Sequence, residues 1–139
     1  MAKAALYTAN NTAAVLTAGS TIPLGSAVHG FGGGCCCNRV IALNGNTITL
    51  NDEGYYLVNA NVTAAATAAG ELTVTLYQDG AAVSGAVSTV TATAAGDYVV
   101  IPVGPIARVR CDRRGSALSL VLSGGGATVS DVAVTVVKL

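Results

Sequence analysis

The feature that most constrains this chain is the alternation of apolar and polar residues along several short segments. In residues 116–124, SALSLVLSG, the side chains of Leu118, Leu120 and Leu122 would share one face of an extended chain. Successive side chains of a β-strand point to opposite faces, so this pattern predicts a strand with one buried side. No segment keeps a 3.6-residue apolar period for ten residues or more. The sequence therefore predicts an all-β protein.

Other segments extend this pattern along the chain. Residues 54–62, GYYLVNANV, and 71–80, ELTVTLYQDG, each place apolar residues on one face. Residues 129–139, VSDVAVTVVKL, are apolar on both faces, which predicts a central strand that is covered on both sides. Turn signals such as Asn44-Gly45 and Asp79-Gly80 separate the segments. The spacing predicts eight to ten short antiparallel strands in a sandwich or barrel. The alanine-rich segment 64–69 could form a helical turn by propensity, but because it is only six residues long and precedes a glycine it is expected to end a strand.

Composition indicates one domain that hides apolar surface in subunit contacts. The 139 residues fit a single domain, residues 1–139, with a core of its own. Hydrophobic residues make up 52% of the chain but aromatic residues only 4%, so each buried side chain is small and contributes little area. Only 10% of the residues are charged, and the mean hydropathy is +0.60. Such a surface favours an oligomer.

Charge and hydropathy exclude several classes of partner. Seven basic and seven acidic residues cancel, so no overall field attracts nucleic acid or an anionic membrane. Polar residues interrupt every apolar stretch well before the roughly 18 residues of a membrane span. The first residues, MAKAALYTANN, lack the apolar region and cleavage pattern of a secretory signal. The localisation stays open, with virion or cell-surface exposure after non-classical release as one route.

The order of these segments resembles the superfamily of tumour necrosis factor and the complement globular heads. Gly54, Tyr56 and Val58 occupy the positions of its Gly-x-Tyr-x-Phe motif, with Val58 in place of the aromatic residue, and Leu76 and Gly80 suit the hairpin that follows. The likeness spans nearly the whole chain and is closest to short, stalkless bacterial and prophage-encoded members. It implies a ten-strand antiparallel jelly-roll sandwich.

The resemblance also implies an assembly and a role. Members of the superfamily are typically compact homotrimers, and the strand face that lines the three-fold axis would here be Tyr55, Leu57 and Asn59. The implied function is a non-enzymatic structural or surface-binding module of a phage, prophage or bacterial surface assembly. Its ligand would be a glycan or a protein held by the apical loops.

Four cysteines raise an alternative function in metal binding or redox chemistry. Cys35, Cys36 and Cys37 are consecutive, so an extended chain would turn Cys36 away from the other two. A tetrahedral zinc site needs four converging ligands, and two of these thiols with Cys111 supply only three. Thiol chemistry between subunits, a disulfide to Cys111 and cysteines without dedicated chemistry all remain open. No metal or cofactor is expected.

The basic segment RVRCDRR, residues 108–114, is the second candidate site. Its arginines are Arg108, Arg110, Arg113 and Arg114, and a guanidinium group suits a carboxylate or phosphate. The alternative is a charged strand edge that discourages edge-to-edge aggregation.

Catalytic constellations are not expected. The one histidine, His29, would lie in a loop without a nucleophile or carboxylate partner. Asp52 and Glu53 precede Gly54 in a turn, where a carboxylate organises the backbone, and no acids form a pair. The glycines of residues 30–34, GFGGG, lack the lysine and helix of a phosphate-binding loop and suggest a flexible connection.

Overall fold

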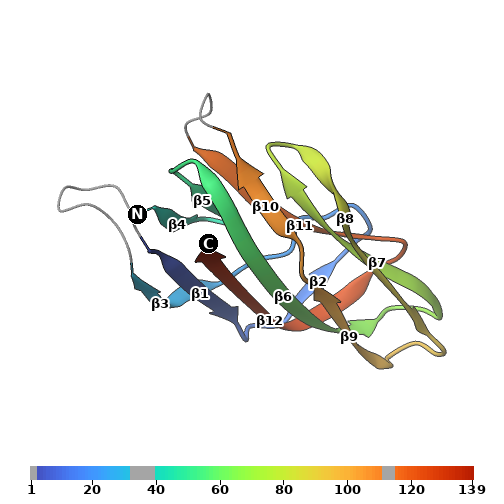
Figure 1. Ribbon diagram of the computed structural model, residues 1–139. Coiled ribbons are helices and arrows are strands. Elements are labelled where there is room, and N and C mark those ends of the chain that lie inside the picture. The colour runs from blue at the N-terminus through green and yellow to red at the C-terminus, as the bar shows by residue number, and fades with distance from the viewer. Residues whose placement is uncertain (1–2, 32–39, 111–114) are drawn as a thin grey trace.

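The structure is a computed structural model that describes residues 3–31, 40–110 and 115–139. These residues form two antiparallel sheets that pack against each other as a sandwich (Figure 1). The larger, seven-stranded sheet contains β1 (Ala5–Asn10), β2 (Ala14–Leu16), β3 (Ser26–Phe31), β6 (Gly54–Ala66), β9 (Tyr98–Val103), β10 (Ile106–Val109) and β12 (Ala127–Lys138). The five-stranded sheet contains β4 (Ile41–Asn44), β5 (Thr47–Leu50), β7 (Gly70–Gln78), β8 (Ala81–Ala92) and β11 (Ser116–Ser123).

The all-β sandwich is confirmed, but the described residues form twelve strands rather than eight to ten. Part of the difference lies in β9 and β10, which pair with the same long strand, β6, and are separated by Gly104 and Pro105. Proline has no N–H to donate to a ladder, so it interrupts a strand that would otherwise run continuously along β6. The three-residue strand β2, which pairs only with the start of β12, is too short to show an alternating pattern.

The core lies between the inner faces of the two sheets, where the alternation predicted it. From β6, Tyr56, Val58, Ala60 and Val62 are completely buried. The three leucines of β11 cover them from the opposite sheet and are at most 2% exposed. Each face of the core is therefore built from every second residue of a strand, which is why the two-residue period of the sequence predicted the buried residues.

The last strand, β12, is central in its sheet, between β6 and β1, as expected. The residues of β12 that point inward, Val132, Val134 and Val136, are buried. The expectation that both faces would be covered is not met in a single chain, because Ala133, Thr135 and Val137 on the opposite face are only half-buried. A sandwich of two layers covers one side of each sheet, so the outward apolar residues of β12 need a further layer that the described part of one chain does not supply.

The turn signals match the hairpins. Asp79 and Gly80 connect β7 to β8, and both have positive φ values, 53° and 82°. Two positive φ values fit a type I′ turn, whose twist suits the flanking strands. The alanine-rich segment ends β6 at Ala66, as expected for a strand end.

The sequence suggested that His29 lies in a loop, but the structure places it in a strand. It lies in β3, opposite Tyr7 of β1, and Gly30 and Phe31 continue the same strand. All six residues of β3 are exposed, so this edge strand is held by backbone pairing to β1 and carries no buried face. The usual alternation signal is absent for that reason.

Candidate functional site

Exposed apolar side chains gather on the seven-stranded sheet. Its outer face is defined here as the side that points away from the five-stranded sheet. Most of the large hydrophobic residues that remain exposed belong to the strands of the seven-stranded sheet, whereas Val87 is on the five-stranded sheet and Leu139 follows β12. Those on the larger sheet are Tyr7, Val15, Val28, Phe31, Tyr55, Leu57, Tyr98, Val100 and Ile106.

Five apolar residues of the outer face form one continuous line, which we call the apolar row. Strand pairing sets Ile106 opposite Leu57, Leu57 opposite Val137, Val137 opposite Ala5, and Ala5 opposite Phe31. Ile106, Leu57 and Phe31 are 56%, 43% and 63% exposed. Adjacent strands are about 4.8 Å apart, so the row crosses about 19 Å of sheet without a polar residue. An apolar line of this length is typical of a surface that another molecule covers.

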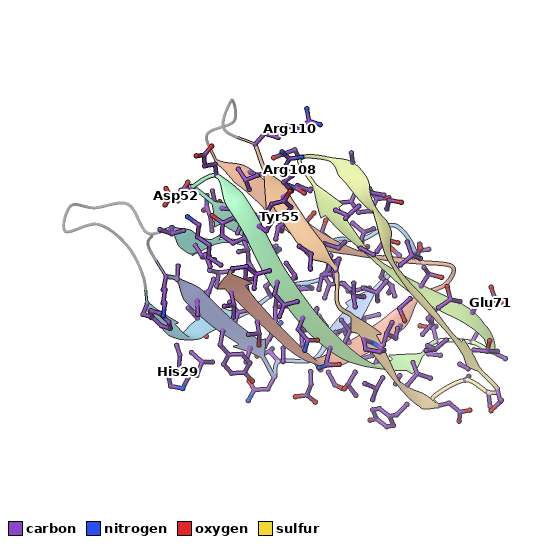
Figure 2. All side chains as sticks on the ribbon, viewed as in Figure 1. His29, Asp52, Tyr55, Glu71, Arg108 and Arg110 are labelled. Carbon is purple, nitrogen blue, oxygen red and sulfur yellow. The ribbon has the colours of Figure 1, made fainter. Side chains whose placement is uncertain are left out.

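Arg108 and Tyr55 flank the apolar row on one side. The two residues face each other across β10 and β6, and the guanidinium carbon of Arg108 lies 5.6 Å from the centroid of the Tyr55 ring. Figure 2 shows Arg108 beside Tyr55, with Arg110 further from the sheet. A cation over an aromatic ring is attracted to its face, so the contact orients the Arg108 side chain.

A polar row flanks the other side. It runs from Asn59 through Thr135 to Tyr7 and His29, again residue opposite residue. The rings of Tyr7 and His29 are stacked, with centroids 6.4 Å apart and an interplanar angle of 20°. The outer face thus combines an apolar line with hydrogen-bonding groups on both sides, which is the composition of a specific protein interface.

The residues that the resemblance assigned to the three-fold axis all lie on this outer face. Tyr55, Leu57 and Asn59 are exposed, and they alternate along β6 with the buried core residues. Sequence reasoning did not find Ile106, Ala5, Phe31 and Val137 as their neighbours. No local signal identifies them, because the row is created by pairing between strands that are distant in the sequence.

A second feature is a polar pocket of about 410 Å³ at the edge of the sandwich, next to β10. It lies between the end of β10, the β7–β8 hairpin and the start of β11. Its lining includes Arg108 and Arg110, which the sequence had identified, and Gln78, Asp79 and Ser116, which it had not. The turn signal at Asp79 predicted the hairpin but gave no indication of what the hairpin faces.

Tyr56, in the motif that suggested the family resemblance, has a structural role. Its hydroxyl donates a 2.7 Å hydrogen bond to the carbonyl oxygen of Asp52. Burial raises the pKa of Tyr56 above its ordinary value of 10.0, the nearby Asp52 charge raises it further, and the backbone hydrogen bond acts in the opposite direction. The Asp52 carboxylate also lies 3.5 Å from Nζ of Lys138. The backbone of Asp52 therefore anchors Tyr56, and its carboxylate holds the end of the last strand through Lys138.

Several predicted site residues lie outside the described residues. These are Cys35, Cys36, Cys37, Cys111, Arg113 and Arg114. Within the described ranges, no three His, Cys, Asp or Glu side chains are grouped as metal ligands would be. In the same part of the chain, no helix has the length and apolar character needed to cross a bilayer.

Comparison with solved structures shows the fold. Murine APRIL, crystallised at pH 8.5, superimposes with a TM-score of 0.69 at 13% identity, covering 99% of each chain. Eiger TNF from S. frugiperda gives a TM-score of 0.68 at 11% identity, covering 99% of this chain and 91% of that one. The globular domain of zebrafish complement 1qA gives 0.64 at 9% identity, covering 97% and 95%. No protein-family model matches the sequence. No curated protein matches it either.

The described chain therefore has the jelly-roll fold of tumour necrosis factor and the complement globular heads, as its sequence pattern had suggested. Identities this low establish shared architecture, and an architecture hosts many functions. The function therefore has to be inferred from the residues of the outer face and of the polar pocket.

Proposed function

We propose that residues 1–139 form one jelly-roll domain that assembles as a homotrimer through its outer face and acts as a non-enzymatic structural or surface-binding module. The apolar row is the observation that carries this proposal. It consists of Ile106, Leu57, Val137, Ala5 and Phe31, aligned across five strands, with Val137 and Ala5 half-buried and the other three exposed.

The energetics favour covering this face. Burial of apolar surface contributes roughly 25 cal/mol per Å², and the exposed aromatic residues Tyr7, Tyr55 and Phe31 all lie on this face. A second copy of the chain offers a matching apolar row and matching polar rows, so self-association satisfies both kinds of group. Contacts of this kind belong to the larger and more hydrophobic class of interfaces.

The number of subunits comes from the family resemblance, which implies three copies around an axis lined by Tyr55, Leu57 and Asn59. In that arrangement Leu57 would exclude water, while the hydroxyl of Tyr55 and the amide of Asn59 can exchange hydrogen bonds between subunits. These residue types at alternate positions of one exposed strand face support the assignment.

The resemblance also suggests a biological setting. The resemblance to short, stalkless members points to a phage, prophage or bacterial surface assembly. A ligand, glycan or protein, would be held by the apical loops or by the arginine segment that contains Arg108, Arg110, Arg113 and Arg114. Tail, holin and lysin genes next to the coding sequence would support a phage setting, and housekeeping neighbours would count against it.

Light scattering coupled to gel filtration tests the assembly. A trimer has a mass of about 41 kDa, three times the 13.6 kDa of one chain. That mass at micromolar protomer concentration is the expected result. A mass of one chain under the same conditions would overturn the proposal, and a stable dimer would overturn the assignment of the three-fold axis.

A further inference from the structure

The polar pocket beside β10 is built within one chain, and its floor is a connected set of hydrogen bonds. Nε2 of Gln78 donates to the carbonyl oxygen of Arg108 and to Oγ of Ser116, both at 2.8 Å. The Ser116 hydroxyl donates in turn to Oδ2 of Asp79 at 2.6 Å. Because these bonds join β7, β10 and β11, the pocket is held in shape before any ligand arrives.

The floor of the pocket leaves one hydrogen-bond acceptor, the side-chain carbonyl oxygen of Gln78, available to a ligand. Both N–H groups of the Gln78 amide are used by the two bonds above, which fixes its orientation. No hydrogen bond to its carbonyl oxygen, Oε1, occurs within the described residues. An oriented amide oxygen of this kind can accept a hydroxyl group from a ligand.

The wall of the pocket supplies positive charge. Arg108 and Arg110 both line it and are exposed, and neither forms an ion pair with an acidic side chain in the described part of the chain. The Tyr55 ring, 5.6 Å from the Arg108 guanidinium carbon, limits the directions that Arg108 can take. Guanidinium groups bind planar carboxylates through paired N–H donors.

The remaining lining residues in the described part of the chain are small. Ala81, Ala82 and Val83 of β8, with Val109, give one shallow apolar side. The volume, about 410 Å³, is near the lower end of ordinary ligand sites and suits one or two sugar rings. The pocket therefore offers cationic donors, an oriented acceptor and a small apolar surface, and it also contains the Asp79 carboxylate, which is bound by Ser116 and by the backbone of Ala117.

We propose that this pocket binds a carboxylated sugar, with the carboxylate at Arg110 and Arg108 and a ring hydroxyl at Oε1 of Gln78. A sugar acid carries an anionic group, hydroxyl donors and an apolar ring face within one small ligand, which matches the three parts of the lining. The inference deepens the ligand-binding part of the proposed function. Every group of the site comes from one chain, and Arg108 also borders the outer face.

Calorimetric titration with glucuronic acid and N-acetylneuraminic acid tests the assignment, with glucose, acetate and glucose 6-phosphate as comparison ligands. The sugar acids are expected to bind. Glucose, which lacks the carboxylate, and acetate, which lacks the ring hydroxyl, are each expected to bind at least about tenfold more weakly. Equal binding of acetate would overturn the role of the sugar hydroxyl. Tighter binding of glucose 6-phosphate would overturn the choice of a carboxylate.

Two variants locate the site. Arg110→Gln is expected to weaken binding of the sugar acids about tenfold or more, whereas Lys3→Gln, an equal change of charge at an exposed residue outside the pocket, should leave it unchanged. Ala82→Phe, at an exposed strand position, should abolish binding by filling the pocket without a change of charge. Equal losses for Arg110→Gln and Lys3→Gln, or full binding by Ala82→Phe, would overturn the proposal.

Light scattering on the same samples separates this inference from the proposed assembly. A trimer that binds no sugar acid removes the pocket assignment and leaves the assembly intact. A monomer that binds sugar acids removes the proposed assembly and leaves the pocket assignment intact.

Discussion

The hydroxyl of Ser116 donates a 2.6 Å hydrogen bond to Oδ2 of Asp79 and so joins two positions 37 residues apart in the sequence. The other carboxylate oxygen of Asp79 accepts a hydrogen bond from the backbone N–H of Ala117 at 2.9 Å. Asp79 also holds a left-handed backbone conformation in the β7–β8 turn, with φ of 53°. One residue thus shapes the hairpin and attaches it to β11.

Replacing Asp79 by alanine should therefore be costly. Asp79→Ala removes both hydrogen bonds and places a residue without a stabilising side chain at positive φ, so we expect a loss of about 2–4 kcal/mol in the free energy of unfolding. Urea titration at a fixed protomer concentration measures it. Asp97→Ala is the matched control, because Asp97 caps an exposed turn through Thr93 and Ala94 without a positive φ and should cost only about 1 kcal/mol. Equal losses in the two variants would contradict this account.

A charge placed in the apolar row should break the assembly. Leu57→Glu puts a carboxylate into the row, where its burial between subunits would leave the charge unpaired. We expect the mass measured by light scattering to fall to that of one chain while the circular dichroism spectrum keeps its β-sheet shape.

Val87→Glu provides the comparison for that experiment. Val87 is 52% exposed, similar to Leu57 at 43%, but it lies on β8 in the five-stranded sheet. The same substitution there should leave the mass unchanged. Dissociation by both variants would show that the outer face has no special role in assembly.

Thr8 is the one position where the core contains a buried polar atom without a partner among the described residues. Its side chain is completely buried, so the hydroxyl has lost water without gaining a hydrogen bond. Thr8→Val keeps the shape and removes that group, and should raise the free energy of unfolding by about 1 kcal/mol. Thr91→Val, at an exposed position of β8, should change it by less than about 0.5 kcal/mol. A loss of stability in Thr8→Val would mean that the hydroxyl is satisfied in solution.

Tyr56 should make the fold sensitive to alkali. Its pKa is raised above 10.0 by burial first and by the charge of Asp52 second, so the folded chain holds the phenolic proton more tightly than the unfolded chain. The stabilising contribution is therefore complete below pH of about 10 and is lost as the pH rises from there through the raised pKa.

Comparison with Tyr56→Phe isolates this effect. The phenylalanine variant lacks the hydrogen bond to Asp52 and should be less stable than the parent chain near pH 8, by about 1 kcal/mol. Its disadvantage should shrink as the pH rises above 10, because the parent loses stability that the variant never had. Urea midpoints measured from pH 8 to 11 give the comparison, and a constant difference across that range would refute the assignment.

The extent to which the sequence predicted the site differs between its parts. The outward position of Tyr55, Leu57 and Asn59 follows from the alternation along β6, which buries Tyr56 and Val58. Arg108 and Arg110 stood out as basic residues, and both are exposed. Gln78 and Ser116 were not found, because each carries an ordinary polar side chain whose role depends on a partner 30 or more residues away.

The sequence by itself determined the strands that alternate, such as β6, β7 and β11, and which side of each of them faces the core. These properties are local, since the two-residue period of a strand can be read from neighbours such as Leu118 and Leu120. The tertiary structure decided which strands lie side by side and in what register. That choice aligns Phe31, Ala5, Val137, Leu57 and Ile106 in one row and brings Gln78, Ser116 and Arg110 around one pocket. Pairing between distant segments depends on how the whole core packs, and no local period encodes it.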